Sequence, residues 1–295
     1  MSRNKVLLAN MYAAYGRGDP QPLFTAMAPD VRFTAHAPRA SFPFGGVHQG
    51  IDGVRRYIAA IASEYAWLRF EARCIVAEGD RAVVLSCGRV RRNSDGMQSE
   101  VDIANAIRLS EGRIVELDEF FDTAGIDAWR RGEPAQQSPS ALAERLMFVP
   151  AAGADAADAA TVIANKAQIR HCYEAYGRHD VRPFLDSLAA DASYVSAARS
   201  DDFGFAAPAS GRDAVAATLT RIAADFELMS YDVDAVIGDG DSVAGLCRVA
   251  HRHRASGRVA RTAKVDLFRM REGRVMQFYE FFDTLGVLRQ IRGET

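Results

Sequence analysis

The amino-acid sequence predicts an α+β protein that consists of two tandem domains with the same fold. Residues 119–123 (EFFDT) recur letter for letter at 280–284, and many shorter matches share this offset of 161 positions without a gap. A period this long exceeds that of solenoid repeats, so each copy should have a core of its own. In both copies helical patterns precede strand patterns, which favours a curved antiparallel sheet with three N-terminal helices on one face.

The repeat divides the chain into copy one (residues 1–133), a linker (134–161) and copy two (162–295). With 295 residues and 48% hydrophobic content, the chain is long enough to bury two cores. The linker is built mostly of Ala, with Pro, Gln, Ser and Asp, a composition typical of flexible segments. A short helix is expected within it over residues 140–148.

Composition narrows the class of partner. The 36 Lys and Arg residues nearly balance the 38 Asp and Glu residues, and the net charge of −2 leaves no footprint for nucleic acid or an anionic membrane. The four cysteines are scattered without metal-ligand spacing, so neither a metal nor another cofactor is expected. The chain starts without an apolar signal region and has no apolar run of about 18 residues. A soluble cytoplasmic protein that binds a small apolar molecule is therefore expected.

The first part of each copy should be helical. In copy one, apolar residues recur at helical spacing over 4–15, and Gly16 ends that helix. Pro20 is suited to the first turn of a short second helix that runs through Ala28. A first strand is expected at 31–35.

A loop and a third helix come next. Residues 38–50 contain several Pro and Gly residues around Phe42 and Phe44. This loop is either a flap over a pocket or a segment pinned to the core by its two aromatic side chains. Gly50 then opens the third helix, which has one apolar stripe.

Four long antiparallel strands should follow from Trp67 onward. Turn sequences at 78–80, 94–96 and 111–112 separate them, each with a glycine where positive φ is cheap. Copy two repeats the glycines of this half, together with the one that opens the third helix, at Gly211, Gly240, Gly257 and Gly273.

The last strand of each copy carries a carboxylate within an apolar row. By alternation, one face holds Val115, Leu117, Glu119 and Phe121 in copy one, and Met276, Phe278, Glu280 and Phe282 in copy two. An acid on the wet side of a sheet and a carboxylate in an apolar cavity both remain open. In a cavity, burial would raise its pKa and suit it to acid–base work.

The aspartates that follow these strands fall on the opposite face. Asp122 and Asp283 are expected to cap the last helical turns, at 127–131 and 288–292.

Together these motifs resemble the nuclear transport factor 2-like, or SnoaL-like, family. The resemblance covers nearly all of both copies and is carried in copy one by residues 12–19, 28–31, 43–46, 50–54, 111–114 and 121–122. It implies a cone-shaped α+β fold with an apolar cavity between sheet and helices. The family includes isomerases, epoxide hydrolases, cyclases, dehydratases and binding or dimerising modules, so the fold alone implies no single activity.

The steroid isomerases of this family use an Asp at the end of the first strand, a Tyr on the first helix and an Asp on the penultimate strand. These positions fall on Ala35 or Ser196, on Met11 or Cys172, and on Asp266. The carboxylate that abstracts the proton is missing from both copies. His36 lies next to its vacant place and is a candidate base.

Copy two resembles the limonene epoxide hydrolases more closely. Their Arg-x-Asp motif matches Lys264 and Asp266, and their last-strand Asp matches Glu280. Their water-holding Tyr and Asn match Tyr194 and Ser196. The resemblance implies that Glu280 is the base, that Asp266 is the acid, and that Lys264 keeps them in opposite protonation states. Lys departs from the family because it lacks the planar fork of Arg, and a buried network that only satisfies itself is the alternative.

Further candidate ligand-binding residues accompany this set. They are Phe268, Phe278, Phe282, Phe203 and Phe205 in copy two, and Glu119, Asn105, His36, Phe42 and Phe44 in copy one. Copy one keeps the carboxylate but has Ile103 and Asn105 where copy two has Lys264 and Asp266. Copy two should therefore carry any catalysis.

Three kinds of function remain. The leading hypothesis is a cofactor-independent hydrolase or cyclase that acts on a small apolar substrate, with epoxide opening favoured. The alternatives are a non-catalytic binding or dimerising module and a ketosteroid isomerase-like isomerase. The two copies are expected to pair as an intramolecular pseudo-dimer, with homo-oligomers also open. We expect burial to raise the pKa of Glu280 unless Lys264 contacts it directly.

Overall fold

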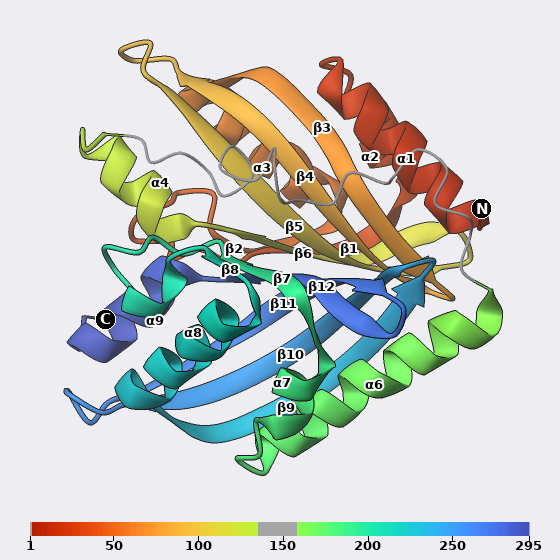
Figure 1. Ribbon diagram of the computed structural model, residues 1–295. Coiled ribbons are helices and arrows are strands. Elements are labelled where there is room, and N and C mark those ends of the chain that lie inside the picture. Colours follow the sequence, from red (N-terminus) through yellow and green to blue (C-terminus); the bar gives the residue numbers. More distant parts are fainter. Residues whose placement is uncertain (1, 135–157, 295) are drawn as a thin grey trace. The chain divides into compact units, whose positions relative to one another are not determined.

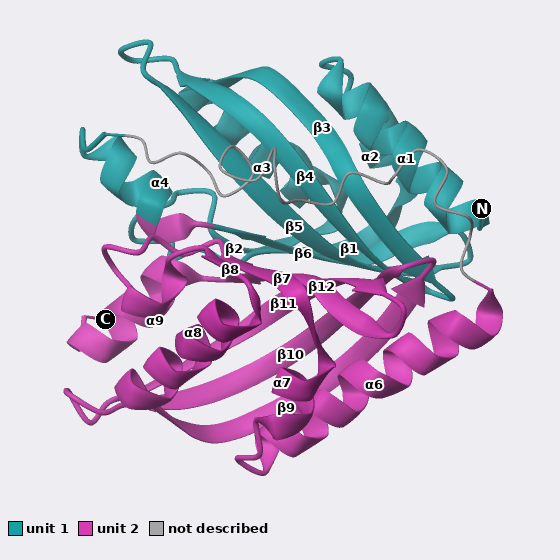
Figure 2. Ribbon diagram, in the orientation of Figure 1, with its two compact units in different colours: residues 1–121, 125–142 teal, residues 122–124, 143–295 magenta. Residues whose placement is uncertain are grey.

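The computed structural model describes residues 2–134 and 158–294, which belong to two compact units. Unit 1 comprises residues 1–121 and 125–142, and unit 2 comprises 122–124 and 143–295 (Figure 2). The helix predicted at 140–148 lies outside the described residues. The domain limits read from the repeat stay a prediction.

Unit 1 combines helices with a six-stranded sheet (Figure 1). Its elements are α1 (Arg3–Gly16), α2 (Gln21–Ala26), β1 (Met27–Ala35), β2 (Gly46–Gln49), α3 (Gly50–Glu64), β3 (Tyr65–Glu78), β4 (Arg81–Arg92), β5 (Gln98–Ser110) and β6 (Arg113–Phe121). The strand order is β2-β1-β6-β5-β4-β3. Helix α4 (Thr123–Arg130) follows β6.

Unit 2 has the same architecture. Its elements are α6 (Ala159–Gly177), α7 (Arg182–Ser187), β7 (Leu188–Ser196), the 3₁₀ turn η2 (Gly204–Ala206), β8 (Ala209–Ser210), α8 (Arg212–Asp225), β9 (Phe226–Asp239), β10 (Ser242–His253), β11 (Val259–Arg271), β12 (Arg274–Phe282) and α9 (Thr284–Arg292). The order β8-β7-β12-β11-β10-β9 matches that of unit 1. The predicted α+β fold with a tandem repeat is thus confirmed.

The four long strands of each copy form the predicted antiparallel hairpins. Between β5 and β6, Glu111 and Gly112 both have positive φ, 50° and 75°, as a two-residue hairpin turn of type I′ requires. One further strand pairing in each copy is not predicted from the sequence. The first strand of each copy lies parallel to the last, β1 beside β6 and β7 beside β12.

Helices cover one face of each sheet (Figure 1). In unit 1, α1 packs on β3 and α3 on β1; in unit 2, α6 packs on β9 and α8 on β7. The long strands carry bulges, and the pairing of β9 with β10 shifts register near Cys247 and again near His251. Bulges bend and twist a strand, so they help each sheet to curve around its helices.

A bulge also corrects the predicted face of the last strand. In the β11–β12 pair the register shifts after Arg269, so that Met270 faces Val275. Val275 is fully buried and belongs to the core that Phe278 joins. It therefore takes the place predicted for Met276. In unit 1 the same shift buries Ile114 instead of Val115.

Several helix boundaries differ from those predicted. Helix α2 ends at Ala26 and not at Ala28, because β1 already begins at Met27. Helices α4 and α9 begin directly after the strand-end aspartates, at Thr123 and Thr284, because no turn separates strand and helix. Asp283 caps α9 as expected, and its Oδ1 accepts a hydrogen bond from the Gly286 N–H at 2.9 Å. Helix α6 begins at Ala159, inside the segment expected to be linker, because Asp158 provides an N-cap.

None of the helices in the described part of the chain is both long and apolar enough to cross a membrane.

Candidate active site

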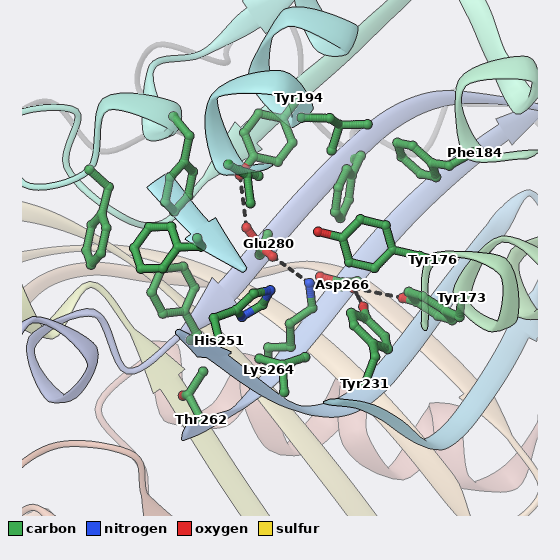
Figure 3. A pocket seen from close by; sticks show the side chains of 18 of the residues that line it. Tyr173, Tyr176, Phe184, Tyr194, Tyr231, His251, Thr262, Lys264, Asp266 and Glu280 are labelled. Carbon is green, nitrogen blue, oxygen red and sulfur yellow. Dashed lines mark hydrogen bonds and ion pairs between the residues drawn. The ribbon is translucent and has the colours of Figure 1, made fainter. Parts of the chain in front are cut away.

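Unit 2 encloses a mostly apolar cavity between its helices and its sheet (Figure 3). Measured as the space open to the centre of a water-sized sphere, its volume is about 120 Å³. Side chains reach it from α6, α7, β7, η2, α8, all four long strands and α9. This is the apolar pocket that the family resemblance implies.

Three charged side chains meet at the wall formed by β11 and β12. Asp266 and Glu280 are direct register partners, and Lys264 precedes Asp266 by two residues on the same face. Lys264 Nζ lies 2.5 Å from Glu280 Oε1 and 3.2 Å from Asp266 Oδ2. All three residues are buried, Asp266 completely. The strands thus bring together the three residues to which the resemblance to epoxide hydrolases assigns catalytic roles.

Tyrosine hydroxyls provide the remaining hydrogen bonds of this cluster. Tyr194, from β7, donates to Glu280 Oε2 at 2.9 Å. Tyr173, from α6, donates to Asp266 Oδ2 at 2.8 Å, and Tyr231, from β9, donates to the same oxygen at 3.3 Å. The resemblance to steroid isomerases points to Cys172 for a helical tyrosine, but the phenol that reaches the acid belongs to the next residue.

A glycine makes the Tyr173 contact possible. Gly245 on β10 is the register partner of Asp266. A Cβ atom at Gly245 would lie only 2.0 Å from the Tyr173 hydroxyl oxygen, which is far inside van der Waals contact. The phenol therefore occupies the space that any other residue at 245 would fill.

Direct contact with Lys264 sets the ionisation of Glu280. Burial alone would raise the pKa of Glu280, but the Lys264 ammonium and the Tyr194 hydrogen bond hold it below its usual value. The sequence predicts a raised pKa only if Lys264 does not contact Glu280 directly. Lys264 does contact the carboxylate, so the pKa is lowered instead. Burial would lower the pKa of Lys264, but the two facing carboxylates raise it, so this side chain stays charged.

Asp266 behaves in the opposite way. Burial raises its pKa to about 6, and the neighbouring Glu280 charge adds to the rise against the attraction of Lys264. Its Oδ2 accepts hydrogen bonds from Tyr173 and Tyr231 and faces Lys264, whereas its Oδ1 has no hydrogen-bond partner among the described residues. A proton on Asp266 is therefore best placed on Oδ1.

One histidine of the cavity is not among the residues selected from the sequence. His251 lies on β10, two residues beyond Val249 on the face that lines the cavity. Burial lowers its pKa to about 4, and the Lys264 charge adds to this effect, so the imidazole is neutral near pH 7. Its Nε2 is buried without a hydrogen-bond partner among the described residues. Strand alternation is the signal that would have found it.

Most of the ligand-binding residues expected in copy two do line this cavity. They are Tyr194, Phe203, Phe205, Phe268, Phe278 and Phe282. Ser196 does not, because it lies at the buried end of β7 and its Oγ accepts a hydrogen bond from the Ala198 N–H. The position of the water-holding Asn in epoxide hydrolases is thus occupied here by a side chain outside the cavity lining.

Unit 1 has a smaller cavity, about 60 Å³ by the same measure. Glu119 lies within it and accepts hydrogen bonds from the Tyr57 hydroxyl and, at 3.2 Å, from Asn105 Nδ2. Asn105 Oδ1 in turn accepts from the Tyr12 hydroxyl at 2.8 Å. Burial raises the pKa of Glu119 against the effect of these hydrogen bonds. Tyr57 and Tyr12 are partners that sequence analysis does not identify.

The other candidates of copy one lie outside the lining of that cavity. Phe42 and Phe44 are buried and pack on Phe121 and Tyr57, so their loop is pinned to the core. His36 stacks on Phe120 and shares a hydrogen bond of 3.0 Å with Asp118. Asp118 and Phe120 flank Glu119 on β6, so their side chains lie on the other face of the strand.

The described residues contain no group of three or more His, Cys, Asp or Glu side chains arranged to hold a metal ion. None of the four cysteines forms a disulfide.

Comparison with known sequences agrees with the repeat. The sequence profile of the SnoaL-like domain matches the chain twice, over residues 8–117 and 169–278. These two stretches are related by the same offset of 161 residues. A search of curated proteins found no match.

Solved structures with a similar fold match about one copy each. A nuclear transport factor 2-like protein of unknown function from Burkholderia pseudomallei is 30% identical over 43% of this chain and 95% of its own, with a TM-score of 0.40. A Rhodopseudomonas palustris protein provisionally assigned as an isomerase is 18% identical over 45% and 99%, with a TM-score of 0.40. A Jannaschia protein provisionally assigned as a SnoaL-like polyketide cyclase is 18% identical over 44% and 92%, with a TM-score of 0.39.

Proposed function

The chain belongs to the SnoaL-like domain family, and we propose that its second copy is an acid–base enzyme that opens epoxides of small, mostly apolar molecules. The observation that supports this proposal is the division of protonation states within one buried cluster. Glu280 is held ionised by Lys264, while burial keeps the facing Asp266 protonated to about pH 6. An ionised base and a neutral acid at one wall are what opening of an epoxide requires.

The base side of the reaction uses Glu280. A water molecule hydrogen-bonded to this carboxylate would lose a proton to it while the water oxygen attacks a carbon of the epoxide ring. The Tyr194 hydroxyl, which already donates to Glu280 Oε2, orients the carboxylate. In a cyclase reaction, a hydroxyl group of the substrate itself would take the place of the water.

The acid side uses Asp266. As the ring carbon–oxygen bond breaks, the electron pair stays on the oxygen, which takes the proton from Asp266 Oδ1. The product is a diol, or a cyclic ether alcohol in the cyclase case. Glu280 is then protonated and Asp266 ionised. Transfer of one proton between them, past the Lys264 ammonium that contacts both, restores the starting state.

The lining of the cavity is suited to a small apolar substrate. Aromatic and aliphatic side chains provide most of its lining, and polar groups come from the Lys264 cluster, Tyr176, His251 and Thr262. The neutral imidazole of His251 has an unpaired Nε2 and can hydrogen-bond a second polar group of the substrate, such as a hydroxyl or carbonyl.

A panel of aliphatic, terpenoid and aromatic epoxides tests this proposal. Mass spectrometry would detect the diol or cyclic ether formed by the intact protein, with the Asp266→Asn variant as the matched control. Product formation that the variant lacks would support the proposal. A panel without turnover would instead favour a binding module, because Lys264 and three phenols already satisfy the cluster apart from one oxygen.

The steroid isomerase mechanism receives no such support, since the position of its base holds Ser196, outside the cavity lining. Pairing of the two copies as a pseudo-dimer, and a cytoplasmic location, stay predictions.

A further inference from the structure

The repeat allows the two cavities to be compared position by position. Ile103 stands in unit 1 where unit 2 has Lys264, and Asn105 stands where unit 2 has Asp266. Glu119, the counterpart of Glu280, is present, lines the cavity and is partly buried. No Lys, Arg or His is found among the described residues that line this cavity. Unit 1 has thus kept the carboxylate but lost the cation that accompanies it in unit 2.

The hydrogen-bond donors to this carboxylate come from different positions in the two units. Phe33 in unit 1 replaces Tyr194, which donates to Glu280 in unit 2. A phenol from a different element, Tyr57 on α3, donates to Glu119 instead. Donors to a carboxylate favour its ionised form. Glu119 therefore has hydrogen-bond donors, but no positive partner among the described residues that line the cavity.

Aromatic side chains make up much of the wall around Glu119. Trp67 and Phe70 replace Leu228 and Tyr231 at the equivalent positions, and both line the cavity. Gly88 admits the indole, because a Cβ atom there would lie 2.4 Å from the Trp67 ring. The aromatic lining comprises Tyr12, Tyr15, Phe33, Tyr57, Trp67 and Phe70.

We propose that the unit 1 cavity binds a small alkylammonium cation, whose charge takes the place that Lys264 fills in unit 2. Aromatic faces attract such cations, and Glu119 would supply the counter-charge. The cavity of about 60 Å³ admits only a compact head group, since one water needs about 10–15 Å³ by this measure.

Binding should also lower the pKa of Glu119. Burial raises the pKa of Glu119, and an ammonium ion beside it would favour the ionised form. The other titratable groups of the lining are Tyr12, Tyr15 and Tyr57. Burial raises the pKa of all three phenols, so they stay neutral near pH 7. Glu119 is thus the one group of the described lining whose titration near or below pH 7 should respond to the cation.

Titration of the intact protein with tetramethylammonium tests the proposal, with tert-butanol as a neutral probe that has the same number of heavy atoms. Calorimetry should give a dissociation constant of about 1 mM for the cation, a reasonable strength for so small a ligand. The binding of tert-butanol should be at least about tenfold weaker. In NMR spectra the indole N–H signal of Trp67 should shift, while that of Trp129 should not.

Substitutions identify the site. Glu119→Gln keeps the size of the side chain and should weaken cation binding at least about tenfold, while Glu116→Gln, on the same strand but ion-paired with Arg108, should have no effect. Ile103→Lys should abolish binding by supplying an internal ammonium, and Ile103→Met should not. Equal affinity for both probes, binding that survives Glu119→Gln in a folded protein, or no binding at about 100 mM cation would overturn the proposal.

Discussion

Asp266 and Glu280 face each other across neighbouring strands, yet their pKa values are displaced in opposite directions. Burial and the facing Glu280 charge raise the pKa of Asp266, whereas the Lys264 ammonium, 2.5 Å away, and the Tyr194 hydrogen bond lower that of Glu280 against its own burial. Glu280 is ionised, and Asp266, completely buried, holds its proton more tightly. Two residues of similar chemistry thereby become a base and an acid.

This difference predicts how turnover depends on pH. The reaction needs Asp266 protonated, and its raised pKa of about 6 means that the active form is lost as pH rises through 6. It also needs Glu280 ionised, and the lowered pKa of Glu280 keeps that form present well into the acidic range. Rates at saturating substrate should fall about tenfold per pH unit above 6. A rate that increases from pH 6 to 8 would contradict these assignments.

Substitutions of Glu280 and Glu119 should show that turnover depends on copy two and not on copy one. Glu280→Gln and Asp266→Asn each remove one member of the acid–base pair and should lower turnover by a factor of about 10²–10⁴. Glu119→Gln makes the same change in unit 1, where Ile103 and Asn105 leave no such pair, and should leave turnover nearly intact. Steady-state kinetics on one responsive epoxide would decide. Similar losses from both Glu→Gln changes would refute the division of labour.

Gly245→Ala should change the pKa of Asp266 without altering Asp266 itself. The added methyl group overlaps the Tyr173 hydroxyl and should displace this phenol from Asp266, at a stability cost of about 1–3 kcal/mol. The Tyr173 hydrogen bond lowers the pKa of Asp266, so the fall in rate should move to higher pH. Gly204→Ala is the control, because nothing lies within 4 Å of its added methyl group. An unchanged pH profile for Gly245→Ala would exclude this role for Tyr173.

Loss of Lys264 should destabilise unit 2 in a pH-dependent way. Lys264→Met leaves two buried carboxyls without a cation and should cost about 3–5 kcal/mol near pH 7. Without the ammonium, burial would raise the folded-state pKa of Glu280 as it does that of Asp266. Carboxyls with a raised folded pKa destabilise the fold as pH increases. The deficit in free energy of unfolding should thus be smaller at pH 4 than at pH 8, and an equal deficit would count against the cluster.

Much of the site follows from strand periodicity and the repeat. Alternation places Lys264 and Asp266 on one face, and the exact offset between copies points to Glu280 as their neighbour. Alternation also brings Phe278 into the cavity, and the resemblance to epoxide hydrolases points to Tyr194. These residues could be predicted because their positions depend on local strand geometry and on the order of adjacent strands.

Other parts depend on packing that the sequence does not reveal. Tyr173 reaches Asp266 from a helix only because Gly245 leaves room for it, and Tyr57 takes over in unit 1 from another element. A bulge exchanges Met276 for Val275 on the core face. Each of these features depends on how a side chain or an extra residue fits against a distant strand, which periodicity alone cannot determine.

Carboxyl ¹³C NMR titration of the intact protein tests the central claim most directly, with Glu280→Gln and Asp266→Asn used to assign the two signals. We predict that Glu280 stays ionised to below its usual range of about 4.3, while Asp266 titrates near pH 6. Two carboxyls that titrate together near pH 4 would show that the cluster holds no acid–base pair.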